Sequence, residues 1–375
     1  MLDIWILNVG HGDSIILHLH GDEADTFAVI DSNTEGTQPP RALEKLYSLG
    51  ADRLSFVALT HPHADHYSGL REICRQFSGR ISNFYCFPFG PFVKGRLKKL
   101  AEAYAAALNK TDSERFRRNL KEFILLMTQV NQDFGEEKWI ELDGHFNDIF
   151  PEGFKGVDII SILPPADAKG YFMQLLDHGS LDHVGNRSKE NDLSAAFLVR
   201  FGGAEIVLGG DGTTTNWLKL AKAWSRKDWN LSADAVKLPH HGSKGDNPPK
   251  VLDNFFGDGH RIGVISANGR SHPHADVLAS LDELNIKPYC TNLSQHCGGK
   301  FREQFSAPEL APRLLRFIST MREPSPSFKN PCQGDICLSI SDNGEVTVTS
   351  EFDNACPYRA DSNLGLSALF TPHSE

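Results

Sequence analysis

The stretch Leu54–Gly69 reads LSFVALTHPHADHYSG. Within it, three histidines and one aspartate fall in six consecutive positions, as His61, His63, Asp65 and His66. The apolar run Leu54–Leu59 before them is short and ends just ahead of Pro62, as is typical of a buried strand. Neutral imidazole nitrogens and carboxylate oxygens are the ligands that zinc and related divalent ions prefer. The stretch therefore predicts a metal site directly after a strand.

The four donors approach this site from two directions. His61 and His63 alternate in an extended segment, which Pro62 favours, so their side chains lie on one side of the chain. Asp65 and His66 follow where the chain turns into a helical pattern. An HxH pair on a surface loop is often incidental, but HxHxDH directly after a strand is a far more specific indication of a metal site.

Composition is ordinary for a globular protein. The chain has 375 residues, of which 40% are apolar and 23% are charged, and its length admits one large α/β domain or two domains. No stretch approaches the roughly 18 uninterrupted apolar residues of a membrane span, and the N-terminus lacks a secretory signature. We therefore expect a cytoplasmic protein without a membrane segment, whose seven cysteines are reduced thiols.

The charge is unevenly distributed along the chain. Lys94–Lys121 contains nine Lys or Arg against three Asp or Glu, a net of +6, which leaves −16 for the rest of a chain of net −10. The net charge of −10 argues against a protein whose whole surface is basic and binds long duplex nucleic acid.

Alternating strand and helix patterns predict an α/β (α+β) fold. Strands are expected at 2–9, 14–20, 26–31, 54–59, 157–163, 195–201, 204–208, 235–238 and 261–266, with a closing hairpin at 335–340 and 345–349. Helices are expected at 41–49, 67–77, 213–225 and 275–284.

Two helical patterns, 95–109 and 111 to about 130, interrupt this alternation. We interpret 1–350 as a single domain with an inserted helical cap at 86–157, followed by a weakly structured tail at 351–375. The basic residues of the cap either contact a phosphate backbone or form a solvated helix face, and they are Arg96, Lys98, Lys99, Arg115, Arg117, Arg118 and Lys121.

Four expected strands end in potential ligands. These are His61 with His63, Asp211, His240 with His241, and His272 with His274. Because ligands gather at the strand ends on one side of an α/β sheet, these side chains are expected to face a common cleft.

The ordered set of motifs resembles the metallo-β-lactamase fold, and within it the ComEC-type hydrolase domain of bacterial DNA uptake and its stand-alone relatives. The motifs are NVGHGDSIIL, FAVIDSN, LTHPHADHYSGL, NDLSAAFLV, IVLGGDG, VKLPHHGSK and ANGRSHPH. The resemblance covers about residues 1–85, 157–295 and 333–350. It implies a four-layer αββα sandwich with two divalent metal ions between its sheets, Zn²⁺ or alternatively Mn²⁺.

The resemblance also implies a ligand set. It places His61 and His63 on one metal, Asp65 and His66 on the other, Asp211 as the bridge, and His241 and His272 as one further ligand each. His240, which is interchangeable with His241, is expected beside the reacting phosphate as an acid or orienting group, and His274 competes with His272. The expected catalytic residues are Asp65 and His240.

The sequence departs from the family pattern in two places. His11 stands where relatives usually carry Gln, so it either faces the substrate or metal or only holds the turn. A third histidine, usual before the bridging Asp, has no clear match, since His145, His178 and His183 lie in loops.

Several further residues are expected to support the site. Asp31 is expected to orient a ligating histidine, and Asp13 and Asn191 to brace loops, with turn capping and strand-end hydrogen bonding as the alternatives. Ser243 and Lys244 are expected to contact phosphate oxygens.

The sequence thus favours a metal-dependent hydrolase, a phosphodiesterase or nuclease that uses a dinuclear centre and a bridging hydroxide on DNA or RNA. One alternative is a hydrolase of a small ester, lactone, thioester or nucleotide with the same centre. The other is a non-catalytic, metal-braced protein that binds a partner through its cap.

Overall fold

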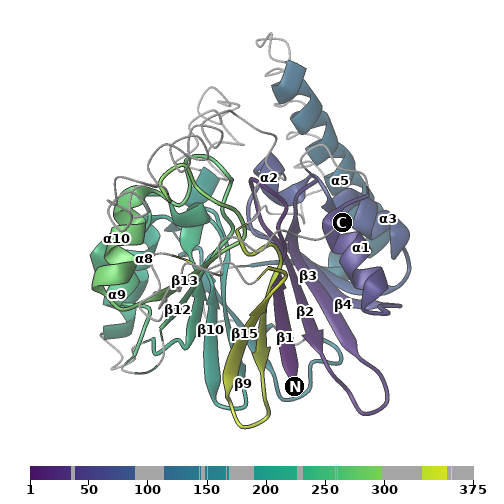
Figure 1. Ribbon diagram of the computed structural model, residues 1–375. Coiled ribbons are helices and arrows are strands. Elements are labelled where there is room, and N and C mark those ends of the chain that lie inside the picture. The colour runs from purple at the N-terminus through teal and green to yellow at the C-terminus, as the bar shows by residue number, and fades with distance from the viewer. Residues whose placement is uncertain are drawn as a thin grey trace, which may run out of the picture.

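The computed structural model describes residues 1–34, 39–88, 114–142, 144, 148–149, 151–165, 167–168, 190–225, 231–257, 259, 261–297, 332–352 and 356. In these residues two sheets lie face to face (Figure 1).

The first sheet has eight strands in the described chain. Their spatial order is β15 (Val346–Ser350), β14 (Ile336–Ile340), β1 (Leu2–Ile6), β2 (Ser14–Leu19), β3 (Thr26–Ser32), β4 (Leu54–Leu59), β5 (Ile81–Cys86) and β6 (Trp139–Glu141). Neighbours are antiparallel from β15 to β3 and parallel from β3 to β6. The strand that precedes the histidine stretch is therefore an inner, parallel one, which explains its unbroken apolar sequence.

The second sheet has seven strands in the same residues. Their spatial order is β13 (Lys287–Cys290), β12 (Ile262–Ile265), β11 (Ala235–Lys237), β10 (Ala204–Leu208), β9 (Ala196–Phe201), β8 (Asp158–Leu163) and β7 (Asp148–Ile149). Strands β10 to β13 run parallel, so the loops that follow β10, β11 and β12 leave the sheet at the same edge.

Helices cover the outer face of each sheet (Figure 1). The first sheet is covered by α1 (Arg41–Ser48), α3 (Leu70–Gln76) and α5 (Glu114–Lys138), and the second by α8 (Thr214–Ser225), α9 (Pro249–Asp253) and α10 (Ala275–Glu283). Between the sheets lies a core to which both contribute, for example Leu17 and Ile30 from one and Phe197 and Ile206 from the other. The protein is therefore an αββα sandwich, as the resemblance implied.

The expected cap at 86–157 contains more than helices. Its residues 139–141 and 148–149 form β6 and β7, which are the edge strands of the two sheets. Helix α5 packs Phe123, Leu126 and Val130 into the core of the first sheet. Strands of two and three residues are too short to show a period of two in the sequence, so the pattern could not reveal them.

Other expectations fall outside the described residues: the helix at 95–109, most of the tail, and His145, His178 and His183. The seven cysteines are buried free thiols. None of the helices in the described chain has the length and apolar character needed to span a membrane.

Candidate metal centre

The loop after β4 brings its donors together within one short turn. Leu59 ends the strand, His63 is the N-cap of the four-residue helix α2 (Ala64–Tyr67), and this helix carries Asp65 and His66. The His61 ring lies 4.5 Å from that of His63 and 4.1 Å from that of His66, centroid to centroid. His61 and His66 are completely buried.

The loops of the second sheet supply the opposite wall. Asp211 follows β10, and His241 lies in the 3-10 turn η2 (Pro239–Gly242) that follows β11. Both side chains are buried, at 2% and 0% exposure. Two sheets that are distant in sequence therefore meet at one polar cluster inside the protein.

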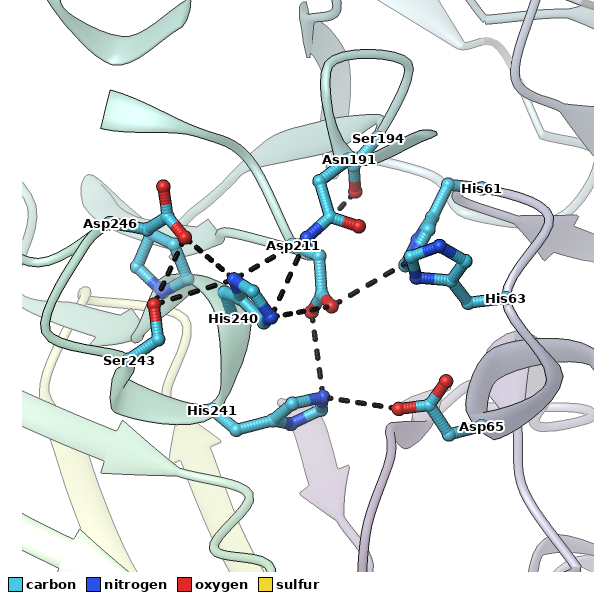
Figure 2. A network of polar contacts seen from close by, with 12 residues as sticks. His61, His63, Asp65, Asn191, Ser194, Asp211, His240, His241, Ser243 and Asp246 are labelled. Carbon is cyan, nitrogen blue, oxygen red and sulfur yellow. Dashed lines mark hydrogen bonds and ion pairs between the residues drawn. The ribbon is translucent and has the colours of Figure 1, made fainter. Parts of the chain in front are cut away.

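Asp211 lies at the middle of this cluster (Figure 2). Its Oδ2 is 3.7 Å from Nε2 of His61, and its Oδ1 is 3.5 Å from Nε2 of His66 and 3.6 Å from Nε2 of His241. Each carboxylate oxygen thus faces a different group of imidazoles, which is the arrangement that a carboxylate bridge between two cations requires.

Four overlapping sets of donors have ligand atoms within 4.8 Å of one another. They are Asp13, Asp31 and His66; His61, His63 and Asp211; His66, Asp211 and His241; and His11, Asp65 and His241. Asp65 Oδ2 lies 3.6 Å from His241 Nε2 and 3.4 Å from His11 Nε2, so the last two sets form one continuous cluster.

The donor atoms fit divalent cations. Nε2 of His61, His66 and His241 and Oδ1 of Asp211 are buried and have no hydrogen-bond partner in the described chain. Buried polar atoms are almost always paired, so several unpaired donors aimed at one another indicate that a cation belongs among them.

The electrostatics agree with this interpretation. Burial would raise the pKa of Asp211, but His241 and His66 outweigh it and hold that pKa well below its usual value. Burial lowers the pKa of His61 well below its usual value, so its imidazole is neutral and able to bind a metal. Burial opposes the charge of His66 too, yet Asp211 and Asp31 raise its pKa well above the usual value. Nε2 of His66 would hold a cation only in its deprotonated form, so metal binding there would be coupled to loss of a proton.

Asp31 holds His66 and the neighbouring residue Thr60 in place. Its Oδ2 lies 2.7 Å from Nδ1 of His66, and it accepts hydrogen bonds from the backbone N–H and the hydroxyl of Thr60. A histidine whose outer nitrogen donates to a carboxylate presents its other nitrogen in a fixed direction. The expected orienting role of Asp31 has this contact in its favour.

A fully buried ion pair lies beneath His241. Asp13 Oδ1 is 3.6 Å from His241 Nδ1, and the other oxygen of Asp13 accepts a hydrogen bond from Lys237 Nζ. Lys237 also donates to the carbonyl of Gly210 at 3.2 Å, and both ionic side chains are completely buried. The sequence analysis missed Lys237, although a lysine inside the apolar strand AVKL was the available signal.

The loop between β1 and β2 approaches α2 closely, and this approach depends on Gly12. Its backbone has φ +119°, and a Cβ placed there would lie 2.1 Å from the carbonyl oxygen of Asp65. The absence of a side chain lets Asp13 N–H donate to that carbonyl at 3.2 Å. Glycine at this position thus allows the loop of Asp13 to pack against the helix of Asp65.

His240 lies beside the cluster but belongs to none of its donor sets. Its Nδ1 is 2.6 Å from Asp246 Oδ2, and its Nε2 is 3.9 Å from Asp211 Oδ2. Ser243 donates to Asp246 at 2.9 Å, and Asn191 Nδ2 lies 3.4 Å from the His240 ring (Figure 2). Burial would lower the pKa of His240, but Asp211 and Asp246 raise it.

Backbone strain aims the two neighbouring histidines in different directions. His240 and His241 have φ of 45° and 54°, in the left-handed region that non-glycine residues rarely adopt, and Gly242 follows at 74°. The resulting turn directs His241 into the centre and His240 toward Asp246. This distinguishes two residues whose roles the sequence left interchangeable.

Glu190 is a second residue that the sequence analysis missed. Its carboxylate contacts Nε2 of His63, on the side of the centre that carries only two histidines. It directly precedes the motif that begins at Asn191, in the part of the chain where a third histidine was sought. Asp246 was missed as well, because an acidic residue in a surface-like loop carries no signal of its own.

Besides His240 and its neighbours, three expected residues lie outside the donor sets. His272 lies next to the cluster, with its ring 6.1 Å from that of His240, and burial lowers its pKa to about 4. His274 caps α10, where its Nδ1 accepts from the N–H of Asp276. Lys244 pairs with Asp276 at 2.5 Å, on the exposed surface. The ligand role of His272 and the phosphate role of Lys244 stay predictions.

Comparison with known proteins finds a family similarity in the first part of the chain. The model of the metallo-beta-lactamase superfamily matches residues 8–82, which contain the loop of Asp13, strand β4 and the histidine stretch. No curated protein sequence matches the chain.

Solved structures with a similar fold have low sequence identity. A variant of the beta-hydroxylase CmlA is 12% identical with a TM-score of 0.41, over 77% of this chain and 52% of that one, so this chain spans about half its length. Zn²⁺-bound PqqB from Methylobacterium extorquens is 10% identical with a TM-score of 0.40, over 77% and 98%. Tm1679, a metal-dependent hydrolase of the beta-lactamase superfamily, is 11% identical with a TM-score of 0.40, over 77% and 96%. The chain thus combines an αββα sandwich and a His/Asp cluster with a segment, residues 8–82, that is similar to the metallo-beta-lactamase superfamily.

Proposed function

We propose that this protein is a dinuclear metal-dependent hydrolase that cleaves phosphodiesters, with nucleic acid as its substrate. The observation that carries the proposal is the position of His240, which Asp246 holds beside the carboxylate shared by two sets of metal donors. In this position His240 would be able to donate a proton to a leaving oxygen.

Two zinc ions, or manganese ions, fit the donor sets as follows. One would be held by His61 and His63 and the other by Asp65, His66 and His241, with Asp211 between them. The chemistry that such ions supply when bound is activation of a water molecule and neutralisation of phosphate charge.

The protein's own contribution begins with the tautomer of His240. When the carboxylate of Asp246 accepts a hydrogen bond from Nδ1–H, the other proton of the imidazolium is on Nε2, which faces Asp211. The Nε2–H then donates to the oxygen that leaves phosphorus, and this prevents the build-up of an alkoxide. Asp211 and Asp246 raise the pKa of His240, which favours its protonated form.

Two features support nucleic acid as the substrate. The PHHGSK and GGDG motifs resemble those of ComEC-type hydrolases. In addition, the exposed Arg118 and Lys121 lie on α5, which is tied to α2 by a hydrogen bond of 2.7 Å from Tyr67 Oη to the carbonyl of Asn119. Two cations on a helix linked to α2 in this way would be available to the phosphates that flank a cleaved bond.

A substrate panel tests the proposal. We expect the protein, supplied with Zn²⁺ or Mn²⁺, to cleave single-stranded DNA or RNA and bis-p-nitrophenyl phosphate, with Asp211→Ala as the inactive control. Cleavage confined to carboxylic esters, lactones or thioesters would instead indicate the small-substrate hydrolase. No turnover after metal reconstitution, together with a tightly bound partner, would indicate the non-catalytic alternative.

The role of His240 as an acid predicts a dependence on the leaving group. His240→Gln is expected to slow cleavage of DNA or RNA by about 10²–10⁴-fold, because an alkoxide leaves poorly without a proton. It should slow cleavage of bis-p-nitrophenyl phosphate much less, since nitrophenolate needs no proton. Rates for both substrates, with metal content measured in parallel, check this expectation.

Asp246→Asn is the companion variant. It removes one carboxylate that raises the pKa of His240, so the decline in rate at alkaline pH should move to lower pH. An equal loss on both substrates, or an unchanged pH profile in Asp246→Asn, would show that His240 does not act as an acid.

A further inference from the structure

A second group of histidines and aspartates lies at the opposite end of the first sheet. One ligand atom from each of Asp3, His18 and His20 lies within 4.8 Å of the others. The rings of His18 and His20 are 4.0 Å apart, centroid to centroid, and His18 stacks on Phe27 at 4.4 Å.

Strand geometry brings these residues together. His18 and His20 are two positions apart at the end of β2, so they point to the same face, and Asp3 is the register partner of His18 on β1. Leu17 and Leu19 point inward to the core between the sheets, which leaves the histidines on the outer face.

The cluster is separate from the metal centre. From Asp13 to His18 and His20 the strand advances about 20 Å, at about 3.3 Å per residue. In Figure 1 the N-terminus, next to Asp3, lies at the lower end of the sandwich, while α2 lies at the upper end.

Two donor atoms of the cluster lack partners although they are buried. His18 is 4% exposed, and its Nε2 lies 2.8 Å from Asp25 Oδ2, whereas its Nδ1 has no hydrogen-bond partner among the described residues. Asp3 Oδ2 lies 2.9 Å from His20 Nε2, whereas its Oδ1 is likewise unpaired. A histidine whose outer N–H donates to a carboxylate is the usual form of a metal ligand, and Asp25 occupies that outer position for His18.

We propose that Asp3, His18 and His20 form a zinc site of their own, with Asp25 orienting His18. Two imidazoles and a carboxylate are zinc ligands, and neighbouring donors around tetrahedral zinc are roughly 3.3 Å apart. The present spacing reaches this value by small side-chain rotations, because one atom of each residue is already within 4.8 Å of the others. His20 is about a third exposed, so the fourth position opens to water.

A zinc ion bound at this site would link β1, β2 and the turn before β3 to one another. Asp3 and His18 belong to adjacent strands, and Asp25 also accepts a hydrogen bond from Gly21 N–H at 3.1 Å within that turn. A cation bound there stabilises the folded chain because the donors are assembled only in the folded state.

Zinc content in a background that disables the metal centre tests the site. After equilibration with buffered Zn²⁺ and removal of the excess, the variant Asp211→Ala should retain one zinc per chain more than the variant Asp211→Ala/His20→Gln. Zinc should raise the midpoint of thermal unfolding of the first variant but not that of the second. The comparison does not depend on turnover, so it stands whether or not the protein is a nuclease.

Two further variants keep the test decisive. His296→Gln is the matched control, because His296 is a partly buried histidine 5.1 Å from His274 that belongs to no donor set, and it should leave the zinc content unchanged. Asp25→Asn, at an exposed turn, should weaken zinc binding about 10–100-fold if Asp25 orients His18. Equal zinc content with and without the His20 substitution would overturn the proposal.

Discussion

Asp211→Asn is expected to remove most of the bound metal and to lower turnover by about a thousandfold or more. Its two carboxylate oxygens face His61 on one side and His66 and His241 on the other. An amide has one acceptor oxygen and no charge, so it serves at most one of the two donor sets. Bound metals contribute several kcal/mol to catalysis, and each 1.36 kcal/mol is a factor of ten in rate.

Metal content per chain and turnover of bis-p-nitrophenyl phosphate measure this effect. Asp246→Asn is the matched control, since Asp246 is also a carboxylate beside a histidine but contacts His240 rather than the donor sets. It should keep its full metal content. If Asp211→Asn kept as much metal as the unaltered chain, the assignment of Asp211 as the shared ligand would be wrong.

Lys237→Met should lower the free energy of unfolding by about 3–5 kcal/mol. The substitution leaves the carboxylate of Asp13 buried without its cation, and an uncompensated buried charge costs about this much. Burial raises the pKa of Asp13 while Lys237 lowers it, so the carboxyl of the variant is expected to take up a proton as the pH falls. Because Asp13 lies beside His241, metal affinity should fall as well.

Denaturant unfolding with two further variants isolates the cause. Lys219→Met removes a lysine from the exposed pair with Asp167, and it should cost no more than about 1 kcal/mol. The double variant Asp13→Leu/Lys237→Met removes both charges and should recover much of the lost stability. A loss in Lys237→Met no greater than that in Lys219→Met would mean that the buried pair contributes little.

The fold was largely predictable because its strongest signals are local. The run Leu54–Leu59 is apolar on both faces and ends at ligand residues, and it forms β4 over the predicted positions. The edge strands β6 and β7 were not predictable, since two or three residues cannot establish a period and their partners come from distant segments.

The candidate site also contains residues that could be predicted from the sequence and residues that could not. Its histidines were recognisable from their spacing and from their places at strand ends, and the structure brings His61, His66 and His241 together around Asp211. The roles of Lys237, Asp246 and Glu190 could not be recognised, because each of them contacts a residue that is distant in sequence or across a loop. The direction of His240 relative to His241 depends on backbone torsion angles, which the sequence alone does not specify.

The left-handed run His240–Gly242 also restricts which substitutions this chain tolerates at its proposed site. Each non-glycine residue held in that conformation costs roughly 1–2 kcal/mol, and branching at Cβ raises the cost further. Asn and Gly relax the backbone there but supply no imidazole. In a directed-evolution library, stability and chemistry would therefore select opposite residues at positions 240 and 241, so new specificities should arise mainly in the surrounding loops.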